Sequence, residues 1–168
     1  MRNKKVLFVA QAALIAAIYV VLTYFISAFH LASGAIQVRI SEALTILPFF
    51  TPAAIPGLTI GCFLANLLTG SLPMDILFGS LATLIGAVGS YFLRRYKWLV
   101  PLPPVVANTV IVPYVLAYVY GAEGSIPFFM LTVGIGEVIS CYVLGGILLN
   151  ALLPYRSILF KGNHSELK

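Results

Sequence analysis

The sequence has 168 residues, of which 61% are hydrophobic and only 9% are charged, with a mean hydropathy of +1.03 and a net charge of +5. Soluble domains carry about 25% charged residues, so this composition excludes an ordinary soluble domain and predicts a membrane protein. The length provides for about six membrane-spanning helices of roughly 20 residues, with no second domain.

Six apolar segments follow one another along the chain and predict an all-α membrane protein, a six-helix bundle forming a single domain over residues 1–168. Their expected bounds are about 6–29, 41–51, 57–69, 75–94, 103–120 and 127–153. The first segment is too long for the apolar core of a signal peptide, so we expect an uncleaved helix. The second and third are each short for a full span and are separated by prolines, so one kinked helix is an alternative.

The distribution of basic residues decides between five and six spans, because Lys and Arg concentrate on the cytoplasmic side of membrane proteins. Six spans place nine basic residues inside, namely Arg2, Lys4, Lys5, Arg94, Arg95, Lys97, Arg156, Lys161 and Lys168. Only Arg39 would then lie outside, whereas five spans would move the last two clusters outside. The sequence therefore predicts a multi-pass cell-membrane protein with both termini in the cytoplasm.

Polar side chains in or beside the apolar segments are candidates for a binding site, because such groups are costly in lipid and usually face a cavity or partner. In the six-span topology they lie in the outer half, and they include Gln37, Arg39, Glu42, Asn66, Asp75, Tyr114, Tyr118, Tyr120 and Glu137. Glu137 is the strongest candidate, since it lies about ten residues into the sixth segment, roughly 15 Å below its outer end. These residues predict a pocket that opens outward.

Structural roles are alternatives for several of these residues. Glu42 can stabilise a helix N-terminus that Ser41 caps, and Asp75 can do the same in the first turn of the fourth segment. Arg39 can pair with Glu42, three residues later, at the membrane interface. Tyr114 can belong to an aromatic belt at the membrane surface.

Several chemistries are excluded by missing motifs. The sequence has no Gly-x-x-x-x-Gly-Lys-Ser/Thr phosphate loop, so we expect no nucleotide hydrolysis by this chain. His30 and His164 fall in a loop and the tail, which leaves no histidine to activate an intramembrane serine or cysteine. No His/Cys cluster predicts a metal site, and Cys62 and Cys141 are expected to be small apolar residues. We therefore expect neither an enzyme nor a cofactor, and the basic charge indicates topology and not nucleic-acid binding.

Four alanines in the first segment predict a contact with another helix. Ala12, Ala13, Ala16 and Ala17 form two overlapping pairs with four-residue spacing, a pattern that allows close approach of helices. Packing within the chain is the alternative, but a stripe on a terminal helix is easily left facing outward. We therefore expect these residues to bind a partner protein.

The layout resembles the substrate-binding S components of energy-coupling-factor (ECF) transporters, which also have six helices, an alanine stripe on the first helix and a long outer loop before the second. More closely, five stretches are similar to the queuosine-precursor transporter (QueT-type) family. They are residues 37–48 (QVRISEALTILP), 52–58 (PAAIPGL), 61–66 (GCFLAN), 75–86 (DILFGSLATLIG) and 136–137 (GE). A nickel or cobalt S component would be expected to begin Met-His, whereas this chain begins Met-Arg.

The resemblance implies capture of a 7-deazaguanine precursor outside the cell, and docking on a membrane scaffold subunit that two ATPase subunits drive with ATP. A deazaguanine presents a ring N–H and an amine side by side, which one carboxylate can accept. Its carbonyl needs a donor such as Arg39, Asn66 or Asn108, and an aminomethyl form carries a cation that a second acid would neutralise. The chemistry of the candidate residues is compatible with such a ligand.

Three other functions remain as alternatives. An S component for a different vitamin or base would share the fold. A stand-alone proton-coupled transporter would use Glu137 as proton carrier, although the chain lacks the doubled length usual for that class. A structural or assembly protein would use its acids only to anchor helices.

Overall fold

The computed structural model describes residues 4–28 and 39–160, and this part of the chain is helical and contains no β-strand. The α-helices are α1 (Lys4–Ala28), α2 (Ala54–Leu68), α3 (Pro73–Phe92), α4 (Leu102–Tyr118), α5 (Ile126–Glu137), α6 (Gly145–Leu152) and α7 (Arg156–Leu159). Two 3₁₀ helices, η1 (Ile40–Phe49) and η3 (Leu153–Tyr155), and one π-helical stretch, η2 (Val138–Leu144), complete them. The predicted all-α fold is confirmed for these residues.

Within the described residues the helices form six apolar segments, since α5, η2 and α6 continue one another. Three stretches are long and apolar enough to cross a membrane, and they are Lys4–Ser27, Pro73–Phe92 and Ile126–Leu159. The remaining three, η1, α2 and α4, are apolar but shorter. The described segments thus agree in number with the prediction, while their lengths are uneven.

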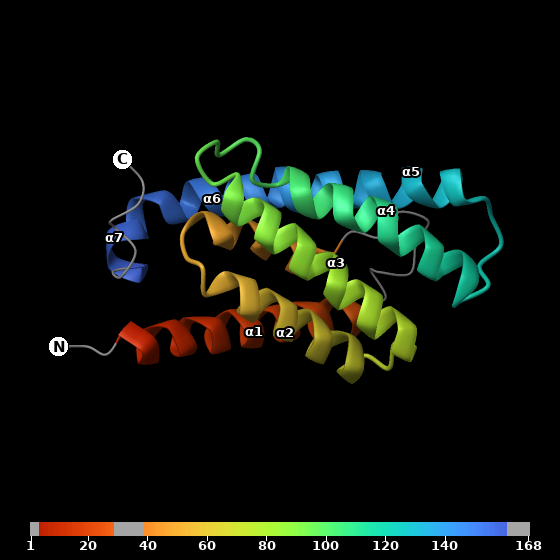
Figure 1. Cartoon of the computed structure of the whole chain (residues 1–168), viewed down its shortest axis with the longest axis horizontal. Helices are drawn as coiled ribbons and strands as arrows, with labels where there is room; N and C mark the ends of the chain where they lie inside the picture. Colours follow the sequence, from red (N-terminus) through yellow and green to blue (C-terminus); the bar gives the residue numbers. More distant parts are fainter. Residues whose placement is uncertain (1–3, 29–38, 161–168) are drawn as a thin grey trace.

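The second and third segments are separate elements and not one kinked helix. Between them the chain turns back on itself (Figure 1), with Thr51 N donating to Leu47 O at 3.1 Å and Ala54 N donating to Thr51 O at 3.2 Å. The first of the two is a 3₁₀ helix that begins near the predicted residue 41, and α2 starts three residues before the predicted residue 57. A 3₁₀ helix rises about 2.0 Å per residue, so ten residues extend roughly as far as 13 in an α-helix.

The connections of the bundle gather at two ends. The start of α1, the loop 93–101 and α7 lie toward one end, and the connections 69–72 and 119–125 lie toward the other (Figure 1). Gln11 Nε2 on α1 donates to Leu159 O on α7 at 3.2 Å, which joins two elements at the first end. That end carries the basic segments of the described chain, as the charge distribution predicts. Its orientation toward the cytoplasm stays a prediction.

Close packing of α1 on α2 depends on two glycines. A Cβ atom at Gly57 would lie 2.8 Å from Ala12 O, and one at Gly61 would lie 3.1 Å from the Cα of Ala16. Any side chain at these two positions would push α1 and α2 apart. Ala12 and Ala16 of the alanine stripe therefore pack inside the chain, which is the alternative to the predicted partner contact.

The two other alanines of the stripe, Ala13 and Ala17, are exposed on α1. Their small side chains leave the backbone of α1 accessible from outside the bundle, where lipid or another helix can lie. Only this half of the predicted partner surface is open in the structure.

Candidate functional site

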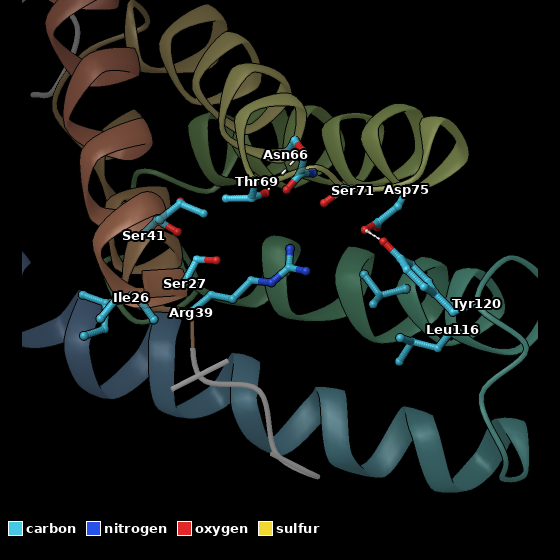
Figure 2. A pocket seen from close by; sticks show the side chains of 13 residues that line it. Ile26, Ser27, Arg39, Ser41, Asn66, Thr69, Ser71, Asp75, Leu116 and Tyr120 are labelled. Atoms are coloured by element: carbon cyan, nitrogen blue, oxygen red, sulfur yellow. Dashed lines mark hydrogen bonds between the residues drawn. The ribbon is translucent and has the colours of Figure 1, made fainter. Parts of the chain in front are cut away.

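A cavity of about 410 Å³ lies between the ends of five elements and forms what we call the outer pocket. It is lined by Thr23, Ile26, Ser27, Arg39, Ile40, Ser41, Asn66, Thr69, Ser71, Asp75, Val112, Leu116 and Tyr120 (Figure 2). Small-molecule sites have volumes of roughly 300–1,000 Å³ with a few placed polar groups, and the outer pocket fits this description. Two other cavities, one beside Tyr114 and one beside Thr109, have almost wholly apolar walls, whereas the outer pocket has a partly polar one.

Asp75 supplies a buried carboxylate to the outer pocket. Pro73 begins α3 and places Asp75 in its first turn, where the unpaired backbone N–H groups favour a negative charge. The Tyr120 hydroxyl donates to Asp75 Oδ2 at 2.8 Å and lies 3.4 Å from the Leu72 backbone N–H, which donates to it. Partial burial raises the pKa of the Tyr120 phenol, and its hydrogen bond to Asp75 acts in the same direction. Tyr120 therefore remains a protonated donor that orients Asp75 at neutral pH.

Arg39 brings the positive charge of the outer pocket. It precedes η1, and its side chain extends across the cavity (Figure 2). Within residues 4–28 and 39–160, no carboxylate oxygen lies within the 4.0 Å of a salt bridge to its guanidinium group. Arg39 and Asp75 thus face one cavity as opposite charges with space between them.

Asn66 reaches the outer pocket from the C-terminal half of α2. Its Nδ2 lies 3.6 Å from Cys62 Sγ, the only acceptor that the described residues give it. A Cβ atom at Gly79 would lie 3.0 Å from the same Nδ2, so the bare backbone of α3 makes room for the amide. The amide carbonyl and N–H groups can therefore bind a ligand in the cavity.

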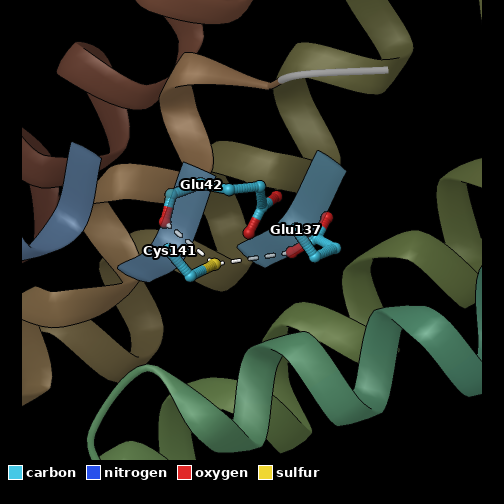
Figure 3. Close-up of side chains that lie close together, drawn as sticks. All are labelled: Glu42, Glu137 and Cys141. Atoms are coloured by element: carbon cyan, nitrogen blue, oxygen red, sulfur yellow. Dashed lines mark hydrogen bonds between the residues drawn. The ribbon is translucent and has the colours of Figure 1, made fainter. Parts of the chain in front are cut away.

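A second group of polar residues, which we call the inner cluster, consists of Glu42, Asn108, Glu137 and Cys141. One carboxylate oxygen of Glu42, one of Glu137 and the Sγ atom of Cys141 all lie within 4.8 Å of one another (Figure 3). Asn108 lies beside Glu137. Cys141 Sγ donates to Glu137 Oε2 at 3.4 Å. The cluster adjoins the outer pocket, because Ser41 lines the pocket one residue before Glu42, and Val112 lines it one turn after Asn108.

Hydrogen bonding within the inner cluster is incomplete. The Tyr19 hydroxyl donates to Glu42 Oε1 at 2.5 Å, but no described residue donates to Glu42 Oε2. Asn108 Nδ2 likewise has no acceptor among the described residues, although Asn108 is only 4% exposed and Glu42 only 1%. Buried polar groups are nearly always paired, so an unpaired acceptor and an unpaired donor in one cluster suggest a bound group.

The backbone that carries Glu137 changes from α to π geometry directly after it. The π-helical stretch Val138–Leu144 contains Cys141, and α-helical geometry resumes at Gly145. Short π-helical insertions within α-helices are frequently found at functional sites. Here the wider turn lies against η1, where Cys141 Sγ is 3.4 Å from Thr45 Oγ1.

The inner cluster also has the composition of a possible metal site. Two carboxylates and a thiol can hold a divalent cation of the zinc class, and Glu42, Glu137 and Cys141 supply three such ligands. The sequence motifs gave no sign of this grouping, because the three residues are scattered over two segments. The expectation that the chain binds no metal stays a prediction.

The structure divides the predicted site residues into two groups and leaves two aside. Arg39, Asn66 and Asp75 line the outer pocket, and Glu42, Asn108 and Glu137 form most of the inner cluster. Tyr114 is 46% exposed, stacks on Tyr118 and borders a separate apolar groove. Gln37 lies outside the described residues.

Of the two tyrosines that donate to carboxyl groups of the site, Tyr120 belongs to the predicted polar residues and Tyr19 does not. Tyr19 is fully enclosed on α1, and a phenol inside an apolar helix needs a hydrogen-bond partner, a signal that could have found it. Tyr120 follows the end of α4 and reaches Asp75 only through the packing of α4 on α3. Nothing in the local sequence distinguishes it from Tyr114 and Tyr118.

Comparison with known proteins gives one family and one relative. A family model described as QueT transporter matches residues 9–154. The Queuosine precursor transporter QueT of Lactococcus lactis subsp. cremoris (strain MG1363) is 34% identical over 98 residues, which are 58% of this chain and 57% of that protein. The chain thus aligns with little more than half of this relative, and no solved structure matches it significantly. The family match includes every residue of the outer pocket and the inner cluster.

Proposed function

The chain belongs to the QueT transporter family, and we propose that it is the substrate-binding subunit of an ECF-type importer for a queuosine precursor of the 7-deazaguanine class. In this proposal the chain captures the precursor at the outer face of the cell membrane. A separate membrane scaffold and two ATPase subunits then supply the energy for uptake, so the chain itself needs no cofactor.

The outer pocket is the observation that carries this proposal. A polar cavity of about 410 Å³ inside an otherwise apolar bundle offers a cation at Arg39, a carboxylate at Asp75 and an amide at Asn66. A deazaguanine carries a carbonyl acceptor, N–H donors and a 7-substituent on one flat ring, and charged and amide side chains can bind groups of these kinds. The pocket lies at the end opposite the basic segments, which supports an outward opening if those segments are cytoplasmic.

Docking on the scaffold is proposed for the exposed half of the alanine stripe. Ala13 and Ala17 are accessible on α1, while Ala12 and Ala16 contact α2. Small residues allow two helices to approach closely, and van der Waals packing between them stabilises the contact within a membrane. The proposed partner surface is therefore narrower than the four-residue stripe.

Binding to the purified chain tests the proposal most directly. We expect isothermal titration with 7-deazaguanine bases to show saturable binding, and mass spectrometry of the purified protein to find a retained base of this class. A retained vitamin or a different base would replace the substrate and keep the S-component assignment. Absence of binding for every base tested would contradict the proposed function.

A proton-coupled transporter is the second candidate, and the inner cluster is the observation that favours it. Glu42 and Glu137 are close together and buried, as carboxyl groups of proton relays in membrane proteins are. Liposomes that contain only this chain separate the two candidates. Uptake driven by a pH gradient alone would favour the second, and uptake that requires partner subunits and ATP would favour the first.

A further inference from the structure

The unpaired groups of the inner cluster are complementary to one edge of a deazaguanine. Among residues 4–28 and 39–160, Glu42 Oε2 is an acceptor without a donor, and Asn108 Nδ2 is a donor without an acceptor. The pyrimidinone edge of the base offers two neighbouring N–H donors and one carbonyl acceptor. A carboxylate takes both donors and an amide N–H reaches the carbonyl, so this edge would satisfy both unpaired groups at once.

Asp75 and Tyr120 form a second binding environment, separate from the inner cluster, where the outer pocket meets the connection 69–72. Asp75 is 8% exposed, and within the described chain its carboxylate has one hydrogen-bond donor, Tyr120, and no ion pair. A carboxylate accepts hydrogen bonds and cannot donate them. An ammonium group would give the Asp75 carboxylate a second donor, whereas a nitrile, which only accepts hydrogen bonds, would give it none.

The inner cluster borders the cavity that contains Asp75. Val112 lines the outer pocket one turn after Asn108 on α4, and Ser41 lines it directly before Glu42. Glu42 is 1% exposed and is not itself part of the cavity lining. A ligand in the cavity would therefore reach the Glu42 carboxylate only after a rotation of that side chain.

We propose, resting on the function proposed above, that the base binds with its pyrimidinone edge at Glu42 and Asn108 and its 7-substituent beside Asp75. This orientation makes the aminomethyl form, which is positively charged, the preferred substrate over the nitrile form. The inner cluster recognises the base that all precursors share, and Asp75 distinguishes their substituents.

Titration calorimetry with three bases tests the orientation. They are 7-aminomethyl-7-deazaguanine, 7-cyano-7-deazaguanine and unsubstituted 7-deazaguanine, each with the wild type and with Asp75→Asn. Loss of a charge-assisted hydrogen bond corresponds to roughly a ten- to hundredfold change in affinity, so the wild type should prefer the amine by about this factor. Asp75→Asn should reduce that preference to about threefold or less and weaken the unsubstituted base much less than the amine.

Two controls keep the test specific. Glu123 is an exposed acid outside the outer pocket, so Glu123→Gln should retain the preference of the wild type. The inner cluster is tested by changing the ligand and not the protein. A deazaguanine without its 2-amino group has lost one of the two N–H donors, and no buried side chain has to be substituted. This analogue should lose affinity by a similar factor in wild type and in Asp75→Asn.

The outcomes distinguish the orientation from the proposed function. Equal affinity of the wild type for amine and nitrile would overturn the orientation, as would an Asp75→Asn variant that weakens all three bases equally. Either result would leave the chain a binder of deazaguanines. Failure of every base to bind would overturn the orientation and the proposed function together.

Discussion

Glu42 and Glu137 are two carboxyl groups that share a buried, apolar environment. Their side-chain oxygens lie within 4.8 Å, and they are 1% and 6% exposed. Two ionised carboxylates at such a distance repel each other strongly where water does not screen them. The pair is therefore stable when a proton, a cation or a hydrogen-bond donor lies between or beside its members, and a ligand with N–H groups provides such donors.

The substitution Glu137→Gln tests whether this pair binds the ligand. The amide keeps the shape of the side chain but cannot accept two donors as a carboxylate does. We expect the affinity for deazaguanine bases to fall by about 2–4 kcal/mol, the scale for a charged hydrogen bond lost at a desolvated site. Thermal unfolding in detergent should be unchanged or shifted upward, since one of two mutually repelling groups is gone.

Glu123→Gln is the matched control for this experiment, because it makes the same chemical change at an exposed loop position. It should alter neither affinity nor thermal stability. Unchanged affinity in Glu137→Gln would show that Glu137 only packs against Cys141 and Glu42.

At the scale of the elements, hydropathy was a reliable guide to the number of segments but not to their geometry. Apolar runs between Pro/Gly-rich turns predict α1, α3 and α4 within a few residues, because lipid requires continuous apolar helices. The 3₁₀ geometry of η1 and the π geometry of η2 were not predictable. Both differ from an α-helix in the spacing between each backbone N–H and the carbonyl to which it donates. Packing against neighbouring helices determines that spacing here.

The exposed face of α1 is the proposed docking surface for the scaffold subunit, and substitutions there test it. Ala13→Trp and Ala17→Trp add a bulky ring where the proposed scaffold helix would approach, while the packing of α1 on α2 is untouched. Each should reduce uptake in cells at least tenfold and leave ligand affinity of the isolated chain within about twofold. Uptake assays paired with calorimetry measure both quantities.

Ala16→Trp provides the contrast, because Ala16 is buried against Gly61 on α2. A tryptophan there overpacks the α1–α2 contact and should lower the unfolding temperature and the yield of folded protein. Normal uptake in both Ala13→Trp and Ala17→Trp would remove this face of α1 as the docking surface.

At the scale of the molecule, the site exists only because distant segments converge. Arg39, Asp75 and Tyr120 come from three elements, and their meeting depends on how α3 packs against α4 and η1. The sequence predicted polar groups at similar depths, which was sufficient for Arg39, Asn66 and Asp75. It could not predict that Tyr114 faces away while Tyr120 faces inward, because that depends on the rotation of α4 about its axis.

The arrangement of the whole chain leads to a prediction about its energy source. The outer pocket lies at one end of the described segments, and no nucleotide-binding motif occurs in the sequence. Secondary transporters usually alternate access with paired repeats, whereas the proposed importer takes its energy from partner ATPases. We therefore expect uptake to require a co-expressed scaffold with its ATPases and to stop when ATP is depleted. With ATP held constant, a protonophore should leave the initial rate of uptake unchanged. Transport into liposomes that contain this chain alone, driven only by a pH gradient, would contradict the importer proposal and identify the Glu42–Glu137 pair as the proton carrier.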